Sequence, residues 1–298
     1  MKKIFSTLLV VASSIASFAQ SNPTDVVALS DTTTMQVALP QESTGKYPSP
    51  YKVTWKADLP IITAGIGLTA LGVKLIDQKK NLTQAQLDGK TRESVPFFDR
   101  GNVGVFSKRA DDLSYIPFQA SFALPVVIGL LDKNQRQNYG QVLVLYLETM
   151  AITGAMFTMT AGTVQRSRPF VYGTEVLNNG YDNNYRLSGN NQRSFYAGHT
   201  AATAAATFYT AKVFADFHPN SKAKPYVWAA AAAVPALVGY WRYKAGMHFL
   251  SDNILGFALG ASTGILVPHF HKKKIPGLSV TPQFGDRYSG LAVTYKLQ

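Results

Sequence analysis

The stretch Val238-Gly-Tyr-Trp-Arg-Tyr-Lys-Ala-Gly-Met-His-Phe-Leu-Ser-Asp252 decides the fold and the chemistry expected of this chain. It joins two apolar runs through Gly246 and carries Arg242, His248 and Asp252 in that order. Positions four apart share one face of a helix, so the spacing predicts that Asp252 accepts a hydrogen bond from one ring nitrogen of His248. A histidine held in this way keeps its other nitrogen for a substrate, which is typical of a nucleophilic imidazole.

Two further short stretches complete the set, Arg168-Pro169 and Ala197-Gly-His-Thr200. A proline ends the preceding helix, so Arg168 is expected in the loop that follows. Gly198 lets the N–H groups of a helix N-terminus approach an anion, while His199 can protonate a leaving oxygen. The guanidinium groups of Arg168 and Arg242 can each grip a phosphate with two parallel hydrogen bonds. Together these residue types predict phosphoryl transfer through a histidine.

The three stretches resemble the motifs of the type 2 phosphatidic acid phosphatase superfamily, which also contains soluble bacterial acid phosphatases and vanadium haloperoxidases. The family pattern is Lys-x6-Arg-Pro, Pro-Ser-Gly-His and Ser-Arg-x5-His-x3-Asp, and the resemblance covers roughly residues 55–268. The chain departs from the pattern in four places. Trp241 replaces the serine of the third motif, Tyr196 and Ala197 replace the proline and serine of the second, and Ala161 stands at the lysine position.

The resemblance implies a phosphomonoesterase that needs neither a metal nor a cofactor. In that scheme His248, oriented by Asp252, attacks phosphorus and forms a phosphohistidine, and His199 protonates the leaving group. Arg168 and Arg242, with the backbone at Gly198, would hold the phosphate oxygens. Three cations that are near in sequence could substitute for the missing lysine and serine, namely Arg166, Arg193 and Lys244.

Composition bounds the other possibilities. The 298 residues contain 29 Lys and Arg against 17 Asp and Glu, and the resulting charge of +12 favours anionic partners such as lipid headgroups or phosphorylated substrates. A nucleic-acid partner is not expected, because no basic helix carries interleaved aromatic residues. The absence of cysteine excludes disulfides, cysteine metal sites and a cysteine nucleophile. Glu148 is interpreted as a buried hydrogen-bonding residue, and His269 and His271 as part of a solvated basic end rather than a metal site.

Apolar segments predict an all-α bundle of about six core helices, at Leu59–Ile76, Tyr115–Leu131, Val142–Met159, Thr200–Phe214, Tyr226–Trp241 and Ile254–Val267. Most are barely long enough for a bilayer, which takes ~17–25 residues per helix. Several are weakly apolar, so a soluble bundle is the alternative. Charge-free stretches with flanking Trp and Lys favour a membrane-embedded bundle.

Outside this core, the chain divides into three appendages. Residues 1–19 have the basic, apolar and small-x-small regions of a secretory signal peptide, and residues 20–54 form a polar extension. The phosphatase-like helical domain covers residues 55–268. A basic and β-like tail, residues 269–298, predicts a short hairpin turning at Gly285–Gly290.

These features predict a cell-envelope location, either the bacterial inner membrane with a periplasm-facing site or the periplasm itself. If all six segments span after a cleaved leader, the motifs face the cytoplasm; a periplasmic site therefore requires that Leu59–Ile76 be re-entrant or merely packed. The function expected is hydrolysis of a lipid phosphomonoester or pyrophosphate, such as phosphatidate, a polyprenyl diphosphate or a lipid A phosphate. The alternatives are a soluble periplasmic acid phosphatase and a catalytically degenerate lipid-phosphate-binding protein of the same fold.

Overall fold

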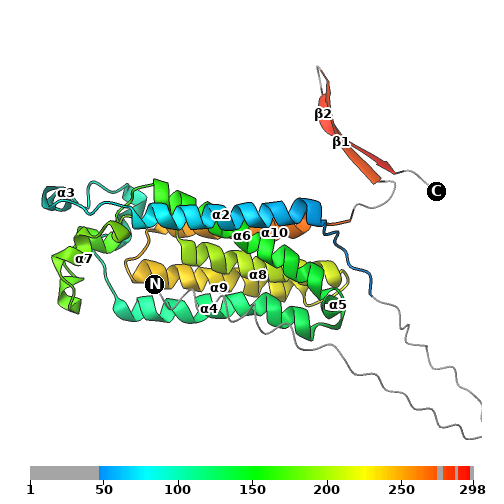
Figure 1. Ribbon diagram of the computed structural model, residues 1–298, viewed down its shortest axis with the longest axis horizontal. Helices are drawn as coiled ribbons and strands as arrows, with labels where there is room; N and C mark the ends of the chain where they lie inside the picture. Colours follow the sequence, from blue (N-terminus) through cyan, green and yellow to red (C-terminus); the bar gives the residue numbers. More distant parts are fainter. Residues whose placement is uncertain (1–46, 274–277, 286–287, 296–298) are drawn as a thin grey trace, which may run out of the picture. The chain divides into compact units, whose positions relative to one another are not determined.

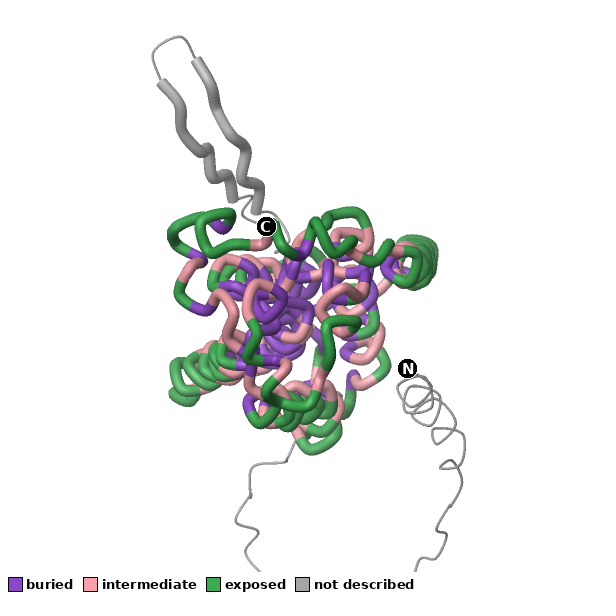
Figure 2. The backbone as a smooth tube through the Cα atoms, turned by 90° about the vertical axis from the view of Figure 1, so that its left-hand side faces the viewer, coloured by how far each residue is buried: buried purple, intermediate pink, exposed green. Residues whose placement is uncertain are grey.

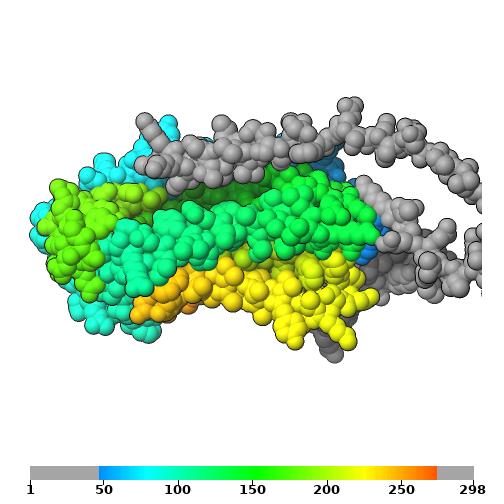
Figure 3. All heavy atoms as spheres, turned by 90° about the horizontal axis from the view of Figure 1, so that it is seen from below, coloured from blue at the N-terminus to red at the C-terminus, as the bar shows by residue number. Residues whose placement is uncertain are grey.

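The computed structural model describes residues 47–273, 278–285 and 288–295. It confirms the predicted all-α bundle, because each of the six apolar segments falls within one long helix. These helices lie side by side in Figure 1 and are α2 (Trp55–Asp77), α4 (Lys108–Leu131), α6 (Tyr139–Thr163), α8 (Gly198–Phe217), α9 (Lys224–Lys244) and α10 (Leu250–Phe270). Figure 3 shows α4 lying along α9 on one face of the bundle.

Short elements occupy the connections between the long helices. They are α3 (Gln84–Asp88), η1 (Phe97–Asn102), α5 (Lys133–Arg136), η2 (Pro169–Tyr172), η3 (Leu177–Asn179), α7 (Asn183–Leu187) and η4 (Gly189–Asn191). The long helices alternate in direction, so α2, α6 and α9 finish at the end where α4, α8 and α10 begin (Figure 1). We call this the motif end, since all three sequence motifs lie there, and the other the opposite end.

Small residues bring α8 and α10 into backbone contact. Three glycines of α10 each meet the carbonyl of one alanine of α8 or of its N-cap, Ala197, in the pairs Gly256–Ala197, Gly260–Ala201 and Gly264–Ala205. A Cβ atom on Gly260 would lie 2.0 Å from the Ala201 oxygen, so no larger residue fits there. Close packing through small residues at four-residue spacing is typical of helices in membranes. It fixes the start of α10 against the start of α8. Seen from the motif end, the buried segments gather at the centre of the bundle (Figure 2).

The outer helices expose apolar side chains. Ile66 on α2 is 60% exposed, and Ile116 and Leu131 on α4 are 68% and 73% exposed. Four helices, α2, α4, α6 and α10, are long and apolar enough to cross a membrane. Apolar faces of this extent are unfavourable in water and suit a lipid environment. The chain therefore has a membrane helical fold.

Three sequence expectations meet the structure at the edges of the bundle. Residues 47–54, placed in the polar extension, pack against it: Tyr51 is fully buried, and its hydroxyl donates a 2.8 Å hydrogen bond to Asp216 on α8. The segment Leu59–Ile76 forms one continuous helix rather than a re-entrant one. The hairpin is confirmed as two antiparallel strands, β1 (Leu278–Gly285) and β2 (Tyr288–Tyr295). The predicted signal peptide and residues 20–46 lie outside the described residues.

Candidate active site

His248 lies in the tight turn between α9 and α10 and is buried. Gly246 makes that turn possible, because its φ of +69° is a conformation that side chains with a Cβ rarely adopt. Nδ1 of His248 lies 2.7 Å from the Ser194 carbonyl oxygen. A carbonyl can only accept, so Nδ1 carries the proton, and Nε2 carries the lone pair in the neutral ring. This is the tautomer that a nucleophilic Nε2 requires.

The predicted hydrogen bond between His248 and Asp252 is not formed. The helix α10 begins at Leu250, so His248 precedes it and the four-residue spacing does not place the two side chains on one helical face. Asp252 is fully buried and accepts instead from the Ser194 hydroxyl at 2.6 Å and from the Phe249 N–H at 2.9 Å. Asp252 therefore positions Ser194, and the carbonyl of Ser194 in turn positions the imidazole of His248.

Arg166 is fully engaged in ion pairs. Its guanidinium binds Asp252 on one side and Asp99 on the other, the latter at 2.6 Å, and it also donates to Ser251. Asp99 accepts from the Ser251 N–H at 2.9 Å and from its hydroxyl. This clamp ties η1, the loop after α6 and the start of α10 together. Arg166 consequently does not replace the missing family lysine, contrary to one of the sequence expectations.

His199 sits at the start of α8 between aromatic rings from α4. Its ring centroid lies 5.1 Å from that of Tyr115 and 4.3 Å from that of Phe118. Tyr115 also lies under the guanidinium of Arg242, 5.9 Å from the ring centroid. Among the residues the structure describes, no protein group hydrogen-bonds the ring of His199, so both nitrogens are available to a substrate. The aromatic walls orient the ring without consuming its donor or acceptor.

Three arginines bring buried N–H donors to the motif end. The Nε atoms of Arg168, Arg193 and Arg242 are each buried and without a hydrogen-bond partner. Arg242 forms an ion pair with Asp111 of α4, whereas Arg168 touches only a weak acceptor, the sulfur of Met247, at 3.1 Å. Within residues 47–273, no ion pair joins Arg168 or Arg193 to a carboxylate. Buried donors and unpaired positive charge are costly unless an anion satisfies them.

The electrostatics of the site link these groups. Burial, and then the charges of Arg242 and Arg168, hold the pKa of His248 well below its usual range. Burial, and then Arg242 and His248, do the same to the pKa of His199, on a helix outside the four candidate spans. Burial, followed by the charges of Arg193 and Arg242, lowers the pKa of Arg168. The charges of Arg168, Arg193 and Arg242 thus act on both histidines in the candidate site.

The remaining sequence candidates differ in their placement. Lys244 is exposed, with its ammonium 5.9 Å from the ring centroid of Tyr240, and takes no part in the cluster. Gly198 is the first residue of α8, and a Cβ atom there would lie 2.5 Å from the ring of Phe157. Of the three possible substitutes for the missing donors, Arg166 is held in ion pairs and Lys244 is exposed, which leaves Arg193 as the candidate.

Sequence reasoning missed the groups that orient the candidates. Ser194 positions His248 through its carbonyl, and Asp99 and Asp111 pair with Arg166 and Arg242. Both aspartates belong to the N-terminal half of the chain, far from the motifs in sequence. Their only signal was indirect: each is an acidic residue between apolar helices, in a connection or first turn at the motif end.

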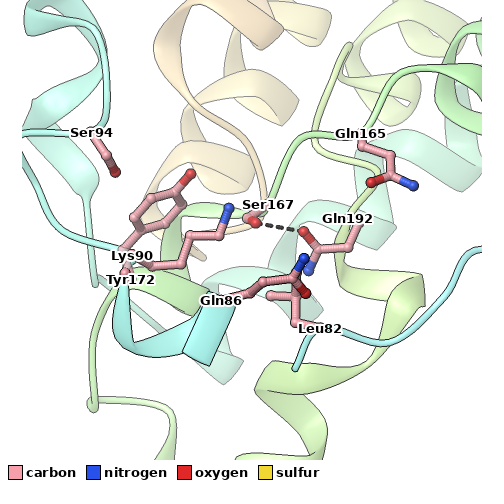
Figure 4. A pocket seen from close by; sticks show the side chains of 9 residues that line it. Leu82, Gln86, Lys90, Ser94, Gln165, Ser167, Tyr172 and Gln192 are labelled. Carbon is pink, nitrogen blue, oxygen red and sulfur yellow. Dashed lines mark hydrogen bonds between the residues drawn. The ribbon is translucent and has the colours of Figure 1, made fainter. Parts of the chain in front are cut away.

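A polar cavity of about 330 Å³ lies among α3 and the segments around residues 165–172 and 192. Figure 4 shows Lys90 and Tyr172 on one side and the hydrogen bond from Ser167 to Gln192, 2.5 Å long, on the other. Its other lining residues are Leu82, Gln86, Gly89, Ser94 and Gln165. Neither His199 nor His248 lines it, although Gln165, Ser167 and Gln192 adjoin Arg166, Arg168 and Arg193 in sequence.

Comparison with known proteins finds a family similarity over the part of the chain that carries the site. Residues 142–276, which contain all three motifs, match the model of the PAP2 superfamily. The match supports the resemblance that the motifs indicate, and with it a membrane phosphatase.

A solved structure is similar over more of the chain: the crystal structure of the first transmembrane PAP2 type phosphatidylglycerolphosphate phosphatase from Bacillus subtilis. It is 18% identical, and the match covers 73% of this chain and 96% of that one, with a TM-score of 0.32. A TM-score of 0.32 is too low for the similarity to support a conclusion about this chain. No curated protein matches.

Proposed function

We propose that this chain hydrolyses a phosphomonoester or pyrophosphate on a lipid, with His248 as nucleophile. One observation carries the proposal: a buried imidazole with its lone pair on Nε2 lies among guanidinium groups, two of which have no ion-pair partner in the described chain. A phosphate dianion supplies the acceptors and the negative charge that Arg168 and Arg193 lack. The same guanidinium groups keep His248 neutral and therefore nucleophilic.

The reaction follows in two displacements. Nε2 of His248 forms a bond to phosphorus while the bond to the leaving oxygen breaks, and that oxygen takes a proton from His199. Water then attacks the phosphohistidine, giving its proton to His199 while the phosphorus–nitrogen bond breaks and phosphate leaves. Bound phosphate opposes the arginine charges that lower the pKa of His199, so substrate binding favours the protonated form that the first step needs.

Arg168, Arg193 and Arg242 would stabilise the equatorial oxygens, and the N–H groups at the start of α8, from Gly198, would add donors. Because these cations belong to the protein, we propose that the reaction needs no metal. Arg193 also bears on the alternative of a degenerate phosphate-binding protein. It brings a positive charge to a site that lacks the family lysine at Ala161, and so favours an active enzyme.

The lipid substrate is inferred from the surroundings of the site. The motif end is one end of a bundle whose outer helices expose apolar side chains, so a phosphate held there lies near a membrane boundary. A lipid can keep its acyl chains in the bilayer while its headgroup reaches Arg168. A soluble acid phosphatase would have no use for these exposed faces.

The test is phosphate release from phosphatidate in mixed micelles and from a soluble aryl phosphate, in the presence of EDTA. Wild type is expected to release phosphate faster from phosphatidate, and His248→Ala to release none above background while keeping the helical circular dichroism of wild type. No release by wild type from either substrate, or equal release by His248→Ala, would contradict the proposal.

We further propose that the site faces the periplasm. Since α2 begins at the opposite end, this orientation and a cleaved leader are compatible only if α2 packs against the bundle without crossing the membrane. Reporters inserted after Gly180, which is exposed at the motif end, and after Asn220, exposed at the opposite end, test it. We expect the first to report periplasm and the second cytoplasm. Two periplasmic signals would indicate a periplasmic bundle, and a cytoplasmic signal at Gly180 would refute the orientation.

A further inference from the structure

A second buried cluster lies away from the motif end and is not used in the mechanism. It contains Asp58 in the first turn of α2, Glu148 on α6 and His271 just beyond α10. One ligand atom from each lies within 4.8 Å of the other two. Asp58 and Glu148 are only 2% and 3% exposed. The sequence interpretation of His271 as part of a solvated basic end is thus wrong, since its side chain lies against these two carboxylates.

The tautomer of His271 directs a lone pair at the carboxylates. Nδ1 lies 2.8 Å from the Val267 carbonyl oxygen, which can only accept, so Nδ1 carries the proton. In the neutral ring Nε2 is then an acceptor, 3.0 Å from Oδ1 of Asp58 and 3.5 Å from Oε2 of Glu148. A backbone carbonyl that fixes one ring nitrogen while the other is free is the usual arrangement of a metal-binding histidine.

Glu148 supplies an independent sign of a missing partner. Its Oε2 atom is buried and accepts no hydrogen bond. Asp58, by contrast, has a second partner for its other oxygen, the N–H of Thr54 at 2.6 Å. No lysine or arginine of the described residues forms an ion pair with either carboxylate. A proton on His271 would leave a buried net charge of −1, whereas a divalent cation would bring the cluster to neutrality.

The distances suit such an ion. Zinc binds imidazole nitrogen and carboxylate oxygen at about 2.0–2.2 Å, so neighbouring tetrahedral ligand atoms lie about 3.4 Å apart. The separations from Nε2 of His271 to Asp58 Oδ1 and Glu148 Oε2, 3.0 Å and 3.5 Å, lie on either side of that value. One nitrogen and two carboxylate oxygens suit zinc or another first-row divalent ion, and a ring nitrogen disfavours calcium and magnesium.

We propose that Asp58, Glu148 and His271 bind a divalent transition-metal ion, with zinc as the best match, that fastens α2 to α6 and to the end of α10. The ion is structural, because the cluster lies away from the candidate nucleophile. Metal binding at this cluster and phosphate hydrolysis at the motif end are independent claims, and the first is tested by binding rather than by activity.

The experiment measures zinc bound per chain. The full chain in detergent is stripped with chelator, then titrated with Zn²⁺ alone against a competing metal indicator. Wild type is expected to bind one Zn²⁺ ion at this cluster. In Glu148→Gln and His271→Gln the affinity for that ion should be at least 10-fold weaker. His269→Gln removes an exposed histidine two residues away and should bind as wild type does. Equal binding by wild type and the two cluster variants would overturn the proposal.

Thermal unfolding keeps the test decisive if a variant binds poorly for another reason. Zn²⁺ should raise the melting temperature of wild type and leave that of Glu148→Gln unchanged. Without metal, Glu148→Gln should be at least as stable as wild type, because it removes one of two buried like charges. A Glu148→Gln protein that is less stable than metal-free wild type, together with no zinc effect on wild type, would show an ordinary hydrogen-bonded ion cluster instead.

Discussion

The two ends of the bundle bury ionisable groups of opposite excess charge. At the motif end, two half-buried arginines, Arg168 and Arg193, have buried Nε atoms and no carboxylate partner in the described chain. Toward the opposite end, two buried carboxylates, Asp58 and Glu148, share one histidine. Burying unpaired charge is expensive, so each end is complementary to a ligand of the missing sign. Comparing each ionisable side chain with its partners therefore distinguishes an anion site from a cation site within one helical fold.

Removing an unpaired guanidinium should have the largest effect at the motif end. Arg168→Ala is expected to lower kcat/KM for phosphatidate about 10²–10³-fold, as for the loss of one donor to a transition-state oxyanion. Arg193→Ala should also lower it, since we propose that Arg193 supplies the charge of the missing family lysine. Lys244→Ala is the matched control, because Lys244 is an exposed cation close in sequence to Arg242 and His248. If Lys244→Ala were as harmful as Arg193→Ala, the assignment of the substitute donor would be wrong.

Breaking the clamp at the start of α10 comes next in size. Asp252→Asn should lower the free energy of unfolding by about 3 kcal/mol, the low end for a broken buried ion pair, because Arg166 keeps Asp99. The control is Asp112→Asn, whose pair with Lys108 is exposed and should contribute ~0–1 kcal/mol. Denaturant unfolding followed by circular dichroism measures both. Similar losses in the two variants would show that Asp252 is not a structural anchor.

Protonation of His248 should make both stability and activity depend on pH in the acid range. Its folded pKa is lowered by burial and by the arginines, so between that value and the unfolded value of ~6.5 the unfolded chain binds more protons. The stability contribution is therefore complete above about pH 6.5 and is lost as pH falls below it. Activity should follow: the acid limb of kcat/KM should lie below pH 6.5 in wild type and move up in Arg168→Gln. An unmoved limb would mean that Arg168 does not govern the protonation of His248.

The fold could be predicted from the sequence because each core helix is a continuous apolar run. Alternating directions then bring Arg168, His199 and His248 to one end without any knowledge of side-chain contacts. The helix boundaries were harder to predict, and the start of α10 determines the hydrogen-bond partner of His248. The helix α10 begins after His248, so the spacing to Asp252 predicted the wrong partner, and a backbone carbonyl serves instead.

The rest of the site depends on pairing between distant segments, which spacing does not encode. In the sequence, Arg166 and Arg193 were equivalent candidates for replacing the missing lysine. In the structure, Arg166 forms ion pairs with Asp99 and Asp252, whereas Arg193 forms none with the described residues. The cluster of Glu148 and His271 was likewise invisible, because it needs α6, α2 and the end of α10 to meet.

The smallest effect is expected where the chain departs from the family pattern. Ala161→Lys and Ala197→Ser restore the family residues, but both alanines are fully buried and Arg193 already supplies a charge. Each change should alter kcat/KM by less than about 10-fold, with overpacking offsetting any gain. A large gain from an inactive wild type would instead support a degenerate protein.

The central claim, that Nε2 of His248 becomes covalently bound to phosphorus, is tested most directly by trapping the intermediate. The protein is mixed rapidly with a labelled aryl phosphate whose leaving group needs little protonation, and then quenched in base, in which phosphohistidine is stable. Wild type and His199→Ala should carry label, more of it in His199→Ala because hydrolysis is slowed, and His248→Ala should carry none. Label retained in His248→Ala, or turnover by wild type with no phosphoenzyme at any time, would contradict the account.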